Sequence, residues 1–284
     1  MSRQTVSGHF IKGTRGSLFV LLRRPARPPL ECVLFVPPFA EEMNKCRRMF
    51  TEVAIGLADS GVIAVLPDLY GTGDSGGDFA DGDWETWQSD LAAVARWCLE
   101  LGHPVTGLLA VRLGCALAVA SADKGFIPAV RNSVLWQPVF DGNRFLSQFL
   151  RMRVASGLMQ ARKETVADLR IMLQNFKEVE VGGYLLSKRL ADDIECIAVP
   201  DVLPQSLGRV SWLEVTRQSD TPLPAVSQEL VERTQSRGGI VHVVCASGEP
   251  FWSTTEITLN ADLVGESIAL FSQNPRESPA LQRS

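Results

Sequence analysis

The sequence carries no excess of positive charge and no long apolar segment. Its 284 residues have a formal net charge of -4, which gives no reason to expect a nucleic-acid partner. No apolar run approaches the roughly 20 residues that span a bilayer, and residues 1–10 are polar and lack the apolar region of a signal peptide. These absences predict a cytoplasmic protein without a membrane span.

The sequence also lacks cysteine pairs at metal-site spacing. None of its six cysteines belongs to a Cys-x-x-Cys pair, and several lie in apolar runs, which favours reduced, buried thiols over a disulfide framework or a zinc site. Gly71, Gly73, Gly76 and Gly77 resemble a phosphate-binding loop, but no Lys-Ser or Lys-Thr follows them, so nucleotide binding is not expected. We therefore expect neither a cofactor nor a metal ion.

The composition is that of an ordinary globular protein, with 45% hydrophobic residues. Short apolar runs typical of buried strands alternate with helical patterns, which predicts a doubly wound, mostly parallel α/β sheet. We expect a hairpin at 5–22, buried strands at 32–36, 62–66, from 108, 133–139, 210–215 and 240–245, and helices at 46–60, 84–101, 115–122, 225–235 and 260–271.

One stretch interrupts this alternation. Residues 140–205 are longer than a simple crossover and carry helical patterns at 144–160 and 166–176, broken by Gly182-Gly183 and Pro200. We interpret 140–205 as an inserted helical cap, and 1–139 together with 206–273 as the core. Residues 274–284 are polar and are expected to form a flexible tail.

The chain is organised around the stretch Leu108–Ala118. An apolar run there turns within a few residues into an Ala-rich helical run, which is the shape of a nucleophile elbow. In that motif, Gly-x-Ser-x-Gly, the central side chain stands above the sheet. Here the five positions are Ala110-Val111-Arg112-Leu113-Gly114, and a guanidinium stays protonated and cannot attack a carbonyl.

The order of strands and loops resembles the α/β-hydrolase superfamily. The elbow frame supports this, and so do the loop 67–76, similar to an Asp-x-x-Gly-x-Gly-x-Ser loop, and 36–40, at the place of the oxyanion loop. More narrowly, the chain resembles the exosortase A system-associated hydrolase 2 group. The resemblance lies in short sequence motifs spread over most of the chain: Pro37–Lys45, Asp68–Gly71, Arg112–Gly114, Leu135–Val139, Gln148–Arg151 and Gly248–Trp252. That resemblance implies a bacterial protein of a polysaccharide-export and exosortase (PEP-CTERM) sorting system, an arginine shared at the elbow, and a hydrolase only by superfamily membership.

A serine-histidine-acid mechanism lacks two of its parts in this sequence. The nucleophile position holds Arg112, and the loop 246–252 after the last expected strand contains no histidine. His9, His103 and His242 lie elsewhere and are interpreted as structural or exposed. Asp220 stands where the catalytic acid could lie. Cys46 is expected near a helix N-terminus, where a thiolate is favoured, and Cys115 is expected to pack inside the helix after the elbow. Neither is expected to be a nucleophile, and the catalytic residues remain unknown.

Arg112 has two possible partners. It can bind a carboxylate, phosphate or sulfate beside the oxyanion N–H groups, or it can form an internal salt bridge with Glu41, Glu42 or Asp220. A buried arginine without any partner would be costly, so one of these must hold. The candidate ligand-binding residues lie at the carboxyl ends of the strands; they are Phe39, Ala40, Glu41, Glu42, Asn44, Lys45, Arg112, Leu113, Trp136, Gln137 and Trp252.

Three functions are compatible with these residues. The first is a catalytically degenerate protein, a pseudoenzyme that binds a small anionic or acyl ligand at Arg112. The second is an atypical hydrolase of an ester-type substrate, in which Glu41 or Glu42 activates water. The third is a scaffold whose cap docks another protein of the export system.

Overall fold

The computed structural model describes residues 3–159, 163–217 and 222–272. Its centre is an eight-stranded sheet in the order β1-β2-β4-β3-β5-β6-β9-β10. β1 and β2 are antiparallel, β2 pairs antiparallel with β4, and all later pairs are parallel. The strands are β1 (Thr5–Lys12), β2 (Ser17–Arg24), β3 (Glu31–Val36), β4 (Val62–Pro67), β5 (Gly107–Val111), β6 (Asn132–Trp136), β9 (Arg209–Thr216) and β10 (Val241–Ser247). The predicted mostly parallel sheet is confirmed.

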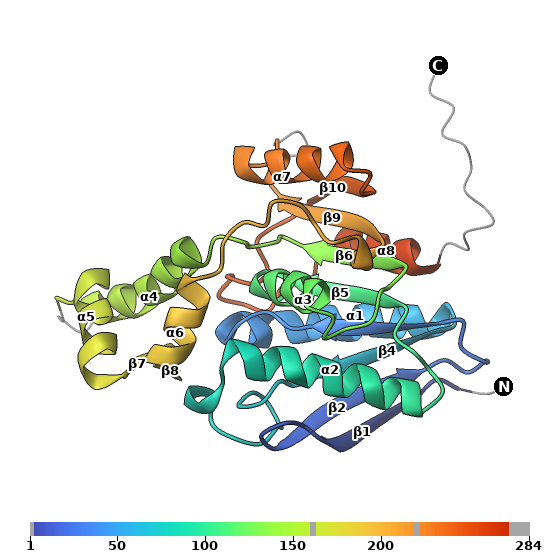
Figure 1. Ribbon diagram of the computed structural model, residues 1–284, viewed down its shortest axis with the longest axis horizontal. Helices are drawn as coiled ribbons and strands as arrows, with labels where there is room; N and C mark the ends of the chain where they lie inside the picture. The colour runs from blue at the N-terminus through green and yellow to red at the C-terminus, as the bar shows by residue number, and fades with distance from the viewer. Residues whose placement is uncertain (1–2, 160–162, 218–221, 273–284) are drawn as a thin grey trace.

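Helices cover both faces of the sheet (Figure 1). Successive residues of β3 belong to different cores: Leu34 and Val36 pack on one side, while Val33 and Phe35 pack on the other. Burial on both faces explains why the central strands read as continuous apolar runs rather than alternating ones. One face carries α2 (Trp84–Glu100), α3 (Leu113–Asp123) and α7 (Ala225–Ser236); the other carries α1 (Glu41–Asp59) and α8 (Ala261–Ser272). No helix of the described residues is long and apolar enough to cross a membrane.

Helix α1 begins at Glu41, five residues before the predicted start at Cys46. Ala40, the residue before it, has φ 49° and turns the chain sharply from the oxyanion loop into the helix. Glu41 and Glu42 then occupy the first turn, where the helix dipole stabilises negative charge. The predicted polar loop at 41–45 is therefore a helical turn, which gives these side chains defined directions.

The segment between β6 and β9 contains α4 (Gly142–Met159), α5 (Val166–Phe176), β7 (Glu178–Val181), β8 (Tyr184–Ser187) and α6 (Lys188–Glu195). We call residues 140–205 the insertion. The hairpin β7–β8 and helix α6 were not predicted. Gly182 and Gly183, expected as a simple break, have φ 59° and 86° and form the two-residue turn of that hairpin.

The insertion contributes no strand to the large sheet, because β7 and β8 pair only with each other. It contacts the core through side chains and helix ends. Arg189 of α6 pairs with buried Asp83 at 3.0 Å, and Asp193 accepts a hydrogen bond from the N–H of Trp84 at 3.2 Å. Phe145 and Phe149 of α4 pack edge-on against Phe39.

Amides of α4, α5 and α6 should exchange with solvent faster than those of β3, β5 and β6. Opening the insertion breaks side-chain contacts and leaves the eight-stranded ladder intact, so its local opening free energy should be lower. Hydrogen-exchange mass spectrometry of the folded protein checks this. Equally slow exchange in the insertion and in the central strands would mean that the two open only together.

Candidate functional site

Arg112 stands on a strained turn between β5 and α3. Its backbone has φ 55° and ψ -121°, a conformation that side chains other than glycine rarely adopt and that is found mostly at functional sites. A β-carbon at Gly114 would overlap the backbone oxygen of Pro37, so only glycine permits this close approach of α3 to the loop after β3. The elbow predicted from the sequence is therefore present, with a guanidinium at its tip.

Glu42 is the ion-pair partner of Arg112. Nε of Arg112 lies 3.1 Å from Oε1 of Glu42, with 13% and 18% of the two side chains exposed. The Arg112 guanidinium carbon also lies 4.8 Å from the ring centre of Trp252, within the range of a cation–π contact. Of the other internal partners predicted, Glu41 lies 3.8 Å from Lys45, and Asp220 lies outside the described residues.

A second carboxyl group, Glu214 of β9, lies in the field of Arg112. It is 5% exposed, and burial raises its pKa to about 7 even though the positive charge of Arg112 acts in the opposite direction. Burial likewise raises the pKa of Glu42, again opposed by Arg112. The sequence analysis missed Glu214, although it is the one charged residue within the apolar run 210–215. Glu42 is thus the paired acid, and Glu214 is a second acid whose pKa the charge of Arg112 lowers.

The two cysteines near the elbow are buried and favour the thiol form. Burial raises the pKa values of both Cys46 and Cys115 well above the ordinary thiol value, so neither is a thiolate near neutral pH. None of the six cysteines, all of which lie in the described residues, forms a disulfide, and four are buried as expected. Cys196 and Cys245 are exposed, which corrects the prediction for those two.

The three histidines lie away from the elbow. The ring of His9 hydrogen-bonds to the Ser7 hydroxyl at 2.7 Å, its centre 5.1 Å from that of Trp97. His103 follows the end of α2, and His242 is exposed on β10. Among the described residues, no three or more histidine, cysteine, aspartate and glutamate side chains converge as a metal site would require.

Six of the predicted residues meet at one pocket, which we call the outer pocket. It has a volume of about 510 Å³ and lies between the start of α1, the elbow, α4 and the loop after β10. Lys45 closes one side by donating to the backbone oxygen of Thr255 at 3.0 Å. The lining residues are Phe39, Glu41, Glu42, Lys45, Arg112 and Trp252, with Phe145, Gln148, Phe149, Met152, Ser253 and Thr254.

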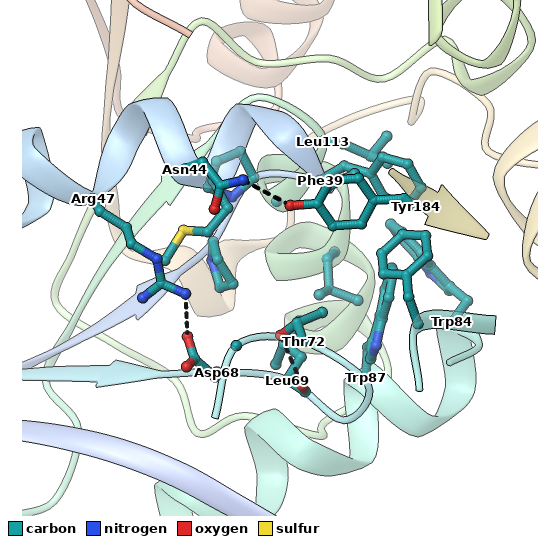
Figure 2. A pocket seen from close by; sticks show the side chains of 18 residues that line it. Phe39, Asn44, Arg47, Asp68, Leu69, Thr72, Trp84, Trp87, Leu113 and Tyr184 are labelled. Carbon is teal, nitrogen blue, oxygen red and sulfur yellow. Dashed lines mark hydrogen bonds and ion pairs between the residues drawn. The ribbon is translucent and has the colours of Figure 1, made fainter. Parts of the chain in front are cut away.

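A second cavity of about 230 Å³, which we call the inner cavity, is also lined by Phe39, and Figure 2 shows its side chains. Of the predicted residues it contains Phe39, Ala40, Asn44 and Leu113. Five aromatic side chains contribute to its wall: Phe39, Phe79, Trp84, Trp87 and Tyr184. Its polar groups other than Asn44 were not predicted; they are Arg47, Asp68, Thr72 and the Tyr184 hydroxyl.

Phe39 separates the outer pocket from the inner cavity. It lines both, is 5% exposed, and packs edge-to-face against Phe79 at 5.3 Å and Phe149 at 5.0 Å between ring centres. Such edge-to-face contacts add to the burial of each ring. The oxyanion loop therefore places an aromatic wall directly beside the elbow.

Asp68 is the centre of the glycine-rich loop. One carboxylate oxygen accepts the N–H of Asp74 at 2.9 Å, and the other lies 3.3 Å from Nη2 of Arg47. Gly73 has φ 54°, and a β-carbon there would overlap the Asp68 carboxylate. Gly73 is thus required because the Asp68 carboxylate occupies the space of a β-carbon. This accounts for the glycine without a phosphate ligand.

Two predicted ligand-binding residues lie outside both cavities. Trp136 is fully buried, donates to the Ser267 hydroxyl at 2.9 Å, and packs edge-on against Phe251. Side chains alternate along β6, so Trp136 points into the core under α1 and α8, and its predicted role is corrected. Gln137, with φ 43°, accepts the N–H of Val215 at 2.8 Å and ties the end of β6 to β9.

No protein-family model and no curated protein matches this sequence. Solved structures do match. Est1E from Butyrivibrio proteoclasticus with bound ferulic acid has a TM-score of 0.68 at 17% identity, over 93% of this chain and 97% of that one. The esterase domain of a Rhodothermus marinus protein has a TM-score of 0.62 at 16% identity, over 94% of this chain and 96% of that one. An alpha-beta serine hydrolase homologue from Coxiella burnetii has a TM-score of 0.51 at 14% identity, over 93% of this chain and 95% of that one.

The chain has the α/β-hydrolase fold. Its strand order and its flanking helices agree with these esterase and hydrolase structures over nearly the whole of both chains. At such low sequence identity the likeness concerns the fold, and function has to be argued from the site itself. The predicted fold class is confirmed.

Proposed function

We propose that this protein binds a small molecule with an aromatic or acyl group in the inner cavity and does not cleave it. The observation that carries the proposal is Arg112 at the tip of the elbow, in an ion pair with Glu42. A guanidinium at that position occupies the space of the nucleophile and has no lone pair to donate to a carbonyl carbon. A hydrolase site that lacks its nucleophile can still bind a ligand.

The surroundings of Arg112 favour an aromatic or acyl ligand over an anion bound at Arg112 itself. Glu42 already pairs with it, and the ring of Trp252 covers its guanidinium. An additional anion there would compete with the Glu42 carboxylate. The inner cavity, by contrast, offers aromatic walls with a few polar groups, which is the usual make-up of a small-molecule site.

The hydrolase alternative has less support. A water-activating base needs a carboxylate that is free to accept a proton. Glu42 is paired with Arg112, and Glu41 accepts the side-chain N–H of Asn44 at 2.8 Å. Neither glutamate has a histidine or a metal ligand set beside it among the described residues.

We propose further that the protein acts in the cytoplasm of a bacterium with an exosortase-linked polysaccharide-export system. The support is the set of short sequence motifs given in the sequence analysis. Two of them, Pro37–Lys45 and Gly248–Trp252, contribute residues to the outer pocket. A scaffold role, with the insertion docking a protein of that system, would use the same elements and is compatible with ligand binding.

Neutral aromatic and acyl probes should quench the tryptophan fluorescence of this protein in a saturable way, because Trp84 and Trp87 line the inner cavity. Benzyl alcohol and hexanamide are suitable probes. Leu117→Phe fills part of the same cavity and should weaken the quenching. Linear, non-saturable quenching that is equal in both proteins would overturn the binding proposal.

The same protein should resist labelling by a fluorophosphonate, because no serine is activated at the elbow. Intact-mass spectrometry after incubation should show the unmodified chain. The double variant Arg112→Ser with Glu42→Gln should also stay unlabelled, since the loop 246–252 still has no histidine. Stoichiometric labelling of any serine in the unmodified protein would refute the non-catalytic assignment.

A further inference from the structure

Arg47, one turn and a half into α1, brings a second arginine to this site from the side of the inner cavity. We infer that the ligand of the inner cavity is a small carboxylic acid with an aromatic or short acyl body, and that Arg47, not Arg112, binds its carboxylate. This inference rests on the proposed function, because it assumes that the inner cavity holds the ligand. It goes further by naming the charged group and the residue that recognises it.

Arg47 has hydrogen-bonding capacity to spare. Its guanidinium has five N–H donors in a planar fork. The contact with Asp68 joins one nitrogen to one oxygen at 3.3 Å, which is longer than a strong charge-assisted hydrogen bond. The side chain is 48% exposed, and the residue lines the inner cavity (Figure 2). A ligand carboxylate can therefore bind Arg47 while Asp68 keeps its own contact.

Arg112 differs in each of these respects. Its contact with Glu42 is shorter, its side chain is 13% exposed, and the ring of Trp252 covers the guanidinium. It lines the outer pocket and not the inner cavity. The cation that faces the aromatic cavity is therefore Arg47.

Asp68 positions Arg47. Its carboxylate accepts the N–H of Asp74, and the residue is 5% exposed, so its position is fixed by the loop. The carboxylate fills the space that a β-carbon at Gly73 would take, so it packs closely against the loop. A fixed acid beside a half-exposed arginine keeps the guanidinium at the cavity wall, where a long side chain would otherwise sample many rotamers.

Tyr184 supplies a second donor. Its hydroxyl oxygen accepts the side-chain N–H of Asn44 at 2.9 Å, which leaves the hydroxyl hydrogen free to point at a ligand oxygen (Figure 2). Burial raises the pKa of Tyr184, so the phenol keeps its proton near neutral pH. A guanidinium and a phenol that line one cavity both offer donors to the oxygens of a carboxylate.

The size of the inner cavity limits the ligand. Its volume of about 230 Å³ corresponds to roughly eight water-sized groups at about 30 Å³ each. Benzoate has this size, and so has a short acyl chain. Benzoate, benzamide and benzamidine share one shape and differ in charge, so they separate a site for an anion from one for a neutral or a cationic ligand.

Isothermal titration calorimetry with these three compounds tests the inference. Benzoate should bind on the order of tenfold more tightly than benzamide, because the hydrogen bonds to a charged acceptor are stronger. Arg47→Gln should reduce benzoate binding to the level of benzamide and leave benzamide unchanged. Tyr184→Phe should weaken benzoate several-fold. The matched control is Arg48→Gln, which removes the same charge from an exposed neighbour on α1 and should change nothing.

The other outcomes each have a defined meaning. If benzamide binds as tightly as benzoate and Arg47→Gln has no effect, the carboxylate inference fails while the proposed function stands. If benzamidine binds most tightly, Asp68 recognises a cation and the inference fails. If Arg47→Gln and Arg48→Gln weaken benzoate binding equally, the cause is general charge attraction, and the inference is overturned. If none of the three binds, both the inference and the binding proposal fall.

Discussion

Replacing Arg112 with methionine should lower the free energy of unfolding at pH 8 by up to about 3–5 kcal/mol, the cost of removing one partner of a buried ion pair, because this pair is only slightly exposed. Methionine keeps much of the bulk of the side chain and removes its charge. Glu42 then loses its counter-ion, and buried Glu214 loses the positive charge that favours its ionised form. Urea denaturation of the two proteins, followed by circular dichroism, measures the difference.

Two controls make this result specific. Arg48→Met removes the same charge from an exposed position of α1 and should change stability by no more than about 0.5 kcal/mol. Adding Glu42→Gln to Arg112→Met removes the unpaired acid and should restore part of the loss. A single variant as stable as the unmodified protein, with an anion that stabilises only the latter, would instead show that Arg112 serves a ligand.

Replacing Glu214 with glutamine should stabilise the protein at pH 8, by as much as about 3 kcal/mol, since each pKa unit corresponds to about 1.4 kcal/mol. Burial raises the pKa of Glu214 from 4.5 to about 7. Because the folded state holds this proton more tightly than the unfolded chain, the stability it contributes is present below about pH 4.5 and is lost as the pH rises to about 7. Glutamine has the same shape and no proton to lose.

The pH dependence distinguishes this effect from a general change in packing. Denaturation curves measured between pH 4 and pH 8 should show a difference between Glu214→Gln and the unmodified protein that is small at pH 4 and grows up to about pH 7. Glu178→Gln, at an exposed position of β7, should follow the unmodified protein at every pH. A pH-independent difference for Glu214→Gln would mean that the carboxyl group titrates alike in the folded and unfolded chain.

Much of the core fold could be predicted because its signals are local. The buried strands are short, uninterrupted apolar runs, and the helices between them carry the 3.6-residue period. Non-local packing limited the prediction elsewhere. The hairpin β7–β8 has strands of four residues, too short for periodicity to show, and the start of α1 depends on the backbone turn at Ala40.

The outer pocket could be predicted for a similar reason. The carboxyl ends of parallel strands lie at one edge of a sheet, so residues that follow different strands, such as Glu42, Arg112 and Trp252, could be placed together from their positions alone. The partner of Arg112 could not be chosen among Glu41, Glu42 and Asp220. That choice depends on the helical direction of the first turn of α1, which sends Glu42 toward the elbow and Glu41 toward Asn44 and Lys45.

The sequence by itself determined that Arg112 stands at an elbow, because an apolar strand, a glycine two residues on and an Ala-rich helix allow little else there. Only the tertiary structure decided what the side chains face. Trp136 lies in the core because of its place in the alternation of β6, and Glu214 approaches Arg112 from a strand about a hundred residues later in the chain. Arg47 meets Asp68 because α1 packs beside the loop after β4. Such meetings join residues far apart along the chain, and short-range sequence patterns carry no information about which distant side chain will be the partner.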